Sequence, residues 1–147
     1  EIAIAPWEPG AVRGSQGSIA SRAAFASHFF ESHFFEKPAP HQDGTSTELT
    51  WLSTLQFGSD PLTGSANTTS GAFSSLGDRF IIRTYSDAWI WIRDGAESLA
   101  EALAGEVCDA GSPSEPQGEA IGFAPDGSGY VTISEGVGSA VLFTPLQ

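Results

Sequence analysis

Apolar and polar residues alternate along most of the chain, in short runs that end at Gly, Asp, Ser or Pro. Alternation over four to eight residues with β-branched or aromatic side chains is typical of a β-strand. The pattern predicts short strands at residues 25–36, 48–57, 71–73, 80–85, 88–92, 120–123, 129–134 and 140–143. We therefore expect an all-β protein.

One segment has a helical pattern instead. Asp94 can cap a helix in which Leu99 and Leu103 lie on one face, and Gly105 can end it. The sequence therefore predicts one short helix, at residues 95–104, in a connection between strands.

Two windows fifty residues apart carry the same order of strands and turns. GAFSSLGDRFIIRTYSDAWIW, at residues 71–91, and AIGFAPDGSGYVTISEGVGSAVLF, at residues 120–143, each contain a strand, an Asp/Gly turn, a strand, a second turn and a strand. A fainter copy lies upstream, where SHFFEKP is followed by TELTWLSTLQF. The equivalent residues in the two clear copies are Phe73 and Phe123, Gly77 and Gly127, Phe80 and Tyr130, Ile81 and Val131, and Thr84 and Ser134.

A period near fifty is typical of β-propeller blades, because four short antiparallel strands and their turns need about 40–50 residues. We expect an incomplete first blade at residues 1–57, a blade with the helix at residues 58–108, and a last blade at residues 109–147. An open β-sandwich is the alternative, since its turns also recur along the sequence.

The number of visible blades is too small for a closed ring, which has about four to eight. The expected fold is thus a partial β-propeller of about two to three four-stranded blades, completed by another chain. The sequence begins at Glu1 without an initiator Met, which suggests the C-terminal fragment of a larger propeller cut by proteolysis into two pieces. Completion of the ring by further copies of the same chain is the alternative.

Composition narrows the choice of partners. Six basic and eighteen acidic residues give a formal charge of −12, which repels nucleic acid and anionic lipid. No apolar run reaches the roughly 20 residues of a membrane-spanning helix. Cys108 is the only cysteine, so it is either a free thiol, buried or not, or is paired with another chain. We therefore expect another polypeptide as the partner, and neither nucleic acid nor a membrane span.

Two stretches carry a resemblance to a known family. RTYSDAWIW and PQGEAIGFAPDGSGYVTISEG resemble the closing blades of bacterial extracytoplasmic propellers related to the phytase propellers. The resemblance covers about half of the chain and implies a propeller that is secreted, periplasmic or at the cell surface. The acidic signatures that define phytases lie in earlier blades and are not found in this chain.

Glu119 and Glu135 open and close the central part of the last repeat. Their equivalents fifty residues earlier are Thr69 and Tyr85, so the two carboxylates do not belong to the repeated framework. In the resembling phytases, the Glu that matches Glu119 helps to hold calcium, an ion that takes several oxygen ligands. Glu119 is therefore a candidate calcium ligand, and both are candidate ligand-binding residues. The alternative for Glu119 is a loop carboxylate bonded to backbone amides.

Arg83 and Tyr85 lie near the end of a predicted strand, on the face opposite Ile82 and Thr84. At the mouth of a propeller channel, the guanidinium can bind a phosphate or a carboxylate. Both residues are therefore candidate ligand-binding residues. The alternative for Arg83 is an ion pair that ties adjacent blades together.

These observations favour a non-catalytic extracytoplasmic propeller that serves as a binding or assembly module. The alternative is a calcium-assisted phosphoesterase of the phytase kind, in which the metal neutralises an anionic substrate and a bound water attacks. The first is preferred because this sequence contains no complete catalytic set and no nucleophile elbow.

Overall fold

The structure is a computed structural model of the 147-residue chain and describes residues 23–28, 31–37, 44, 46–57, 67–111 and 113–146. These residues form three antiparallel sheets and one short helix. We call the sheets blades 1, 2 and 3. Blade 1 contains β1 (Ala23–His28), β2 (Glu31–Glu36) and β3 (Thr50–Gln56). Blade 2 contains β4 (Thr68–Phe73), β5 (Arg79–Thr84), β6 (Ala88–Ile92) and β7 (Val107–Asp109), and blade 3 contains β8 (Gly118–Phe123), β9 (Gly129–Ser134) and β10 (Val141–Pro145).

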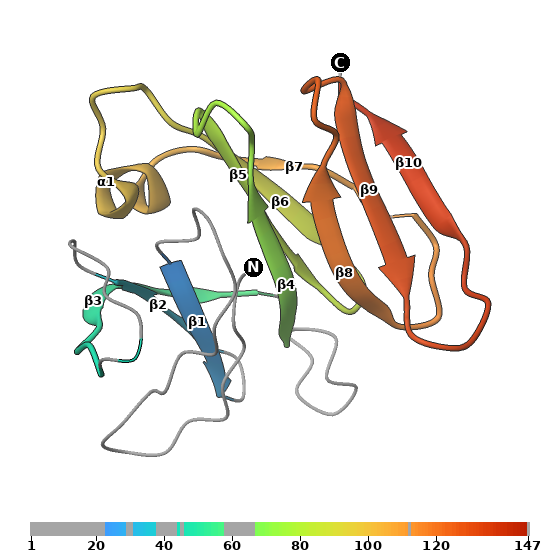
Figure 1. Cartoon of the computed structure of the whole chain (residues 1–147), viewed down its shortest axis with the longest axis horizontal. Coiled ribbons are helices and arrows are strands. Elements are labelled where there is room, and N and C mark those ends of the chain that lie inside the picture. Colours follow the sequence, from blue (N-terminus) through green and yellow to red (C-terminus); the bar gives the residue numbers. More distant parts are fainter. Residues whose placement is uncertain are drawn as a thin grey trace.

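Blade 2 lies between the other two blades (Figure 1). Within each sheet, strands that follow one another in the sequence are neighbours. The first strands of blades 2 and 3 are joined where Thr69 Oγ1 donates to Gly118 O at 2.8 Å and Ile121 N donates to Ser70 Oγ at 3.3 Å. This arrangement of small sheets is that of a β-propeller, so the prediction of an all-β chain forming part of a propeller is confirmed.

The repeat in the sequence is also a repeat in backbone geometry. β8 and β9 begin fifty residues after β4 and β5, and a register shift follows the first residue of both β4 and β8. Gly77 and Gly127 occupy the same place in the following turn, with φ of 71° and 73°. A left-handed conformation of this kind favours glycine, which explains why both turns contain one.

The two equivalent turns are each held by a serine hydroxyl bonded to a carboxylate. Ser74 Oγ donates to Asp78 Oδ1 at 2.6 Å, and Ser128 Oγ donates to Asp126 Oδ1 at 2.6 Å. These bonds are the main reason why the pKa values of both carboxyl groups are lowered. The order of serine and aspartate is reversed between the turns, so the pair is preserved although the individual positions are not.

Blade 2 has apolar residues on both faces because successive side chains of a strand point to opposite sides. Toward blade 3, a buried cluster contains Ile81, Ala88, Ile90, Ile121 and Tyr130. Toward blade 1, the buried cluster contains Phe34, Phe57, Phe80, Ile82, Trp91, Ala102 and Leu103. In the latter, Phe80 stacks on Trp91 with ring centroids 5.0 Å apart. The blades are therefore held together mainly by apolar contact between sheets.

The prediction of one strand at residues 25–36 is wrong. The segment forms two strands, β1 and β2, which pair antiparallel from Ala23 with Glu36 to His28 with Glu31. No Gly, Pro, Asn or Asp lies between the two strands, so the usual signals of a turn are missing from the sequence.

The helix is shorter than the predicted range of 95–104. α1 (Leu99–Ala104) is capped by Ser98, not by Asp94. Ser98 Oγ accepts from Glu101 N at 3.2 Å and Ser98 N donates to Glu101 Oε2 at 2.8 Å, which forms a capping box. Hydrogen bonds from Ser98, first of all from its hydroxyl, lower the pKa of the Glu101 carboxyl. Asp94 begins a separate turn, in which its carbonyl accepts from Glu97 N at 2.8 Å.

The expected end of the helix at Gly105 is confirmed. β7 extends to Asp109, one residue past the border expected after residue 108, and the division of the chain at residues 57 and 108 stays a prediction. Cys108 lies exposed in β7, so the buried thiol considered among the alternatives is wrong. In the part of the chain that the structure describes, no helix has the length and apolar character needed to cross a membrane.

Leu103→Ala is expected to lower the free energy of unfolding by about 2–5 kcal/mol, because the side chain is buried between blades 1 and 2. Chemical denaturation measures the change. Leu76→Ala is the matched control, since Leu76 is 85% exposed and its loss should cost less than about 0.5 kcal/mol. Equal effects of the two substitutions would show that α1 is not packed on the blades.

Candidate functional site

The four candidate ligand-binding residues gather at one end of blades 2 and 3. Arg83 is near the end of β5, and Tyr85 directly follows that strand. Glu119 is the second residue of β8, and Glu135 directly follows β9. Antiparallel pairing places the start of β8 beside the end of β9, and contact between the blades brings both to the end of β5.

Hydrogen bonds to Gln117 and Gly118 hold three of these residues together. Gly118 N donates to Tyr85 O at 3.1 Å, and Glu135 N donates to Gln117 O at 2.9 Å. The side chain of Gln117 donates from Nε2 to Glu119 Oε1 at 3.1 Å. One short segment at the start of β8 therefore positions Tyr85, Glu119 and Glu135.

Arg83 has a different environment from the other three candidates. Its side chain is fully buried, and Nη1 lies 2.9 Å from Glu115 Oε2, whose side chain is 3% exposed. Nη1 also donates to Ala120 O at 3.1 Å, and Nε donates to Thr84 O at 3.1 Å. These contacts join β5 of blade 2 to β8 and the loop before it. Arg83 and its partners therefore tie blade 2 to blade 3.

Gly118 makes room for this tie. A Cβ atom at position 118 would overlap the guanidinium of Arg83, so a glycine is required where the two strands approach. Fifty residues earlier the equivalent position is Thr68, whose hydroxyl instead forms a buried hydrogen bond with Ser32 Oγ of blade 1. The two joints between blades thus use different polar groups at equivalent places.

Glu115 and Gln117 were not identified from the sequence, although they organise this end of the molecule. Both lie in SPSEPQG, a stretch without the alternation of a strand. A Pro-rich loop gives no periodic signal by which a buried carboxylate could be recognised. Glu115 Oε1 is buried without a hydrogen-bond partner among the described residues, and only the tertiary contacts identify this residue.

The accessible candidates do not form a metal site among themselves. Glu119 and Tyr85 are half-buried, and Glu135 is exposed. Within the described residues, no three side chains of His, Cys, Asp or Glu converge as metal ligands. Calcium binding at Glu119 therefore stays a prediction.

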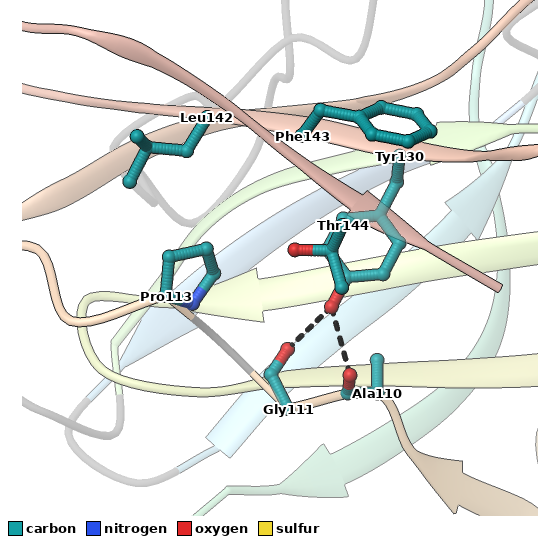
Figure 2. Close-up of a pocket in the computed structure, with 7 residues that line it drawn as sticks. All are labelled: Ala110, Gly111, Pro113, Tyr130, Leu142, Phe143 and Thr144. Atoms are coloured by element: carbon teal, nitrogen blue, oxygen red, sulfur yellow. Dashed lines mark hydrogen bonds between the residues drawn. The ribbon is translucent and has the colours of Figure 1, made fainter.

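An open groove lies between the loop that follows β7 and the last strand, β10 (Figure 2). Its volume is about 480 Å³. The Tyr130 hydroxyl lies 2.8 Å from both Ala110 O and Gly111 O, and so anchors the loop against β9. The sequence did not indicate this groove, because its walls come from three separate segments. The groove is lined by Ala110, Gly111, Pro113, Tyr130, Leu142, Phe143 and Thr144.

Comparison with known proteins gives a similarity of shape. No model of a protein family and no curated protein matches the chain. Among solved structures, the chain is similar to the β-propeller domain of Cps50 (Swd1) from Myceliophteria thermophila, with a TM-score of 0.48 and 17% sequence identity. The match covers 86% of this chain and 37% of that chain. The assignment to the propeller class rests on the strand registers and blade contacts given above.

Removal of the Glu115 carboxylate is expected to destabilise the protein strongly, because the charge of Arg83 would stay buried without it. Glu115→Ala should cost about 3–5 kcal/mol of unfolding free energy, as for other broken buried ion pairs. Glu135→Ala is the control, since Glu135 is exposed. Replacement of both Arg83 and Glu115 by leucine should recover part of the loss. If Glu115→Ala costs no more than Glu135→Ala in chemical denaturation, the tie does not hold the blades.

Proposed function

We propose that this chain is a non-catalytic binding and assembly module of an extracytoplasmic β-propeller, and that polypeptide outside these 147 residues covers the outer face of blade 3. The outer face is the side of blade 3 turned away from blade 2. It is defined here by Val131 and Ile133 of β9 and by Val141 and Phe143 of β10.

The observation that carries this proposal is the matching register of blades 2 and 3. In blade 2, Ile81 pairs with Ile90 and Arg83 pairs with Ala88. In blade 3, the equivalent pairs are Val131 with Phe143 and Ile133 with Val141. Directly opposite residues of an antiparallel pair lie on the same side of a sheet. The outer face of blade 3 is therefore the counterpart of the blade 2 face that blade 3 itself covers.

The two equivalent faces differ in exposure. In blade 2, Ile81 and Ala88 are 0% exposed and Ile90 is 6% exposed. In blade 3, Val141 is 66% exposed and Phe143 is 54% exposed. Full burial of a Val or Phe side chain is worth about 1.5–3 kcal/mol, so a sheet laid on this face would gain several kcal/mol. Contiguous exposed apolar faces mark interaction sites.

The residues that define the outer face of blade 3 are all apolar, which agrees with an assembly through apolar contact. Ile133 stands where blade 2 has the buried Arg83, so the outer face of blade 3 offers no cation for a buried ion pair. A covering sheet would therefore meet it with apolar side chains, as Ile121 and Tyr130 meet blade 2. The extracytoplasmic location, secreted, periplasmic or at the cell surface, rests on the resemblance of the last two blades to phytase-related propellers.

Val141→Asp should abolish association through this face, because a carboxylate would be buried without a partner. The chain should sediment above its monomer mass of 15.4 kDa or copurify with another polypeptide, and the variant should not. Val137→Asp is the matched control, since Val137 is fully exposed in the turn before β10. A wild-type chain that is a monomer without copurifying polypeptide contradicts the proposed assembly.

A calcium-assisted phosphoesterase is the second candidate function. What favours it is the gathering of Glu119 and Glu135 around Gln117 at one end of the inner strand β8. Ca²⁺ needs six to eight oxygen ligands, so further ligands would have to come from polypeptide beyond these residues or from water.

If the chain is a calcium-assisted phosphoesterase, Ca²⁺ should raise the thermal unfolding midpoint of the wild-type chain, because a ligand that binds only the folded state stabilises it. Glu119→Gln should remove the response, while Glu106→Gln, at an exposed position away from the site, should keep it. Differential scanning fluorimetry with Ca²⁺ and with EDTA measures both. An unchanged midpoint in the wild-type protein excludes a calcium site that Glu119 forms within this chain and water alone.

A further inference from the structure

The outer edge of β10 is open in the described part of the chain. β6, the equivalent strand of blade 2, lies between β5 and β7. β10 pairs with β9 on one side and has no described strand on the other. Figure 1 shows β10 at the margin of the molecule. In blade 2, the strand that fills the corresponding place is β7, which pairs antiparallel with β6.

The backbone groups at this edge are equivalent to the groups of β6 that bond to β7 in blade 2. Leu146 N donates to Ser128 O at 3.0 Å, toward β9. Because the direction of backbone groups alternates along an antiparallel strand, those of Val141 and Phe143 point to the open edge. Their counterparts in blade 2 are Ala88 and Ile90. Ala88 O accepts from Ala110 N at 3.0 Å, just beyond β7.

Pro145 marks the end of the ladder that this edge can form. In the same alternation, its missing N–H would have pointed to the open edge, and proline within sheets is confined to such edges. An added strand can therefore bond to the N–H and C=O of Val141 and Phe143 and to the C=O of Pro145. This is a short ladder of the same kind as the one between β6 and β7.

The groove described above runs along the same edge. Leu142 and Thr144 line it together with Tyr130, and Figure 2 shows the Tyr130 hydroxyl directed to Ala110 and Gly111. In an added antiparallel strand, the residues opposite Leu142 and Thr144 would project over this groove. The groove offers apolar surface and hydroxyl groups, so it suits side chains such as valine and threonine.

Charge indicates what should flank such a strand. Every basic residue precedes position 94, whereas residues 94–147 contain nine acidic residues and no Lys, Arg or His. Asp126 and Glu135 lie exposed beside the two ends of the β9–β10 pair, and Asp109 lies exposed at the end of β7 near the groove. Opposite charge across an interface favours encounter and fixes register.

We propose that the open edge of β10 binds an extended segment that has alternating apolar or hydroxyl side chains and basic residues at its ends. The segment adds an antiparallel strand opposite Leu142, Phe143 and Thr144. It places alternate side chains in the Tyr130 groove. This inference rests on the proposed function in one respect, since the segment is taken to belong to the polypeptide that covers blade 3.

The test uses a synthetic peptide of alternating valine and threonine with a lysine at each end, added to the full chain. Hydrogen exchange followed by NMR should show the Phe143 amide slowed about 10-fold when the peptide is at ten times its Kd. The same peptide with glutamate at each end should bind more weakly, and the difference should shrink as salt is raised. Unchanged exchange at Phe143 with saturating peptide overturns the proposal.

Thr144→Arg should abolish binding of the lysine peptide, because the new side chain fills the groove and repels the peptide. Thr50→Arg is the matched control, since it adds the same charge at an exposed strand residue of blade 1. If Thr144→Arg binds the peptide as well as the wild type does, the groove is not the site and the proposal fails.

The outcome also separates this inference from the proposed function. If the peptide does not bind but Val141→Asp still dissolves the assembly, the strand-binding edge is wrong and the covered face stands. If the peptide binds a wild-type chain that is otherwise monomeric and without partners, the edge stands and the proposed assembly falls.

Discussion

The fold depends on the burial of two apolar faces for each small sheet. A four-stranded sheet of five- to six-residue strands cannot shield both of its faces, so it is stable only between neighbours. Blade 2 satisfies this requirement: β5 gives Phe80 and Ile82 to the cluster with blade 1 and Ile81 to the cluster with blade 3. Blade 3 satisfies it on one side only. Its proposed role in assembly follows from that difference.

Apolar contact holds the blades together, but polar groups fix how they meet. The guanidinium of Arg83 crosses from blade 2 to Glu115 and Ala120, and it fits only because position 118 is a glycine. A buried ion pair gives little net stability compared with apolar residues of the same shape. Its effect here is geometric, since the segment that it anchors also positions Tyr85, Glu119 and Glu135.

Blade 3 has three different features at its surface. Its outer face is apolar, its edge strand presents backbone groups, and its carboxylates gather at the end near Gln117. The first two suit contact with polypeptide and the third suits a cation or a polar ligand. Glu119 lies at the start of β8, away from the edge strand, whereas Glu135 directly follows β9 and so lies near both the carboxylate end and one end of the edge.

The sequence by itself determined most of the strands and the glycine turns, because each depends on residues close together in the chain. It also determined the fifty-residue repeat, because the same local pattern occurs twice along the chain. The local sequence was misleading in two places. No usual turn residue separates β1 from β2, and both Asp94 and Ser98 are residue types that cap helices, although only Ser98 caps α1. The ion pair of Arg83 was identified only by the tertiary structure, because its partner Glu115 lies 32 residues away in a loop. The groove beside Tyr130 likewise exists only after blades 2 and 3 pack, since alternation within one strand says which face a residue takes but not what lies opposite.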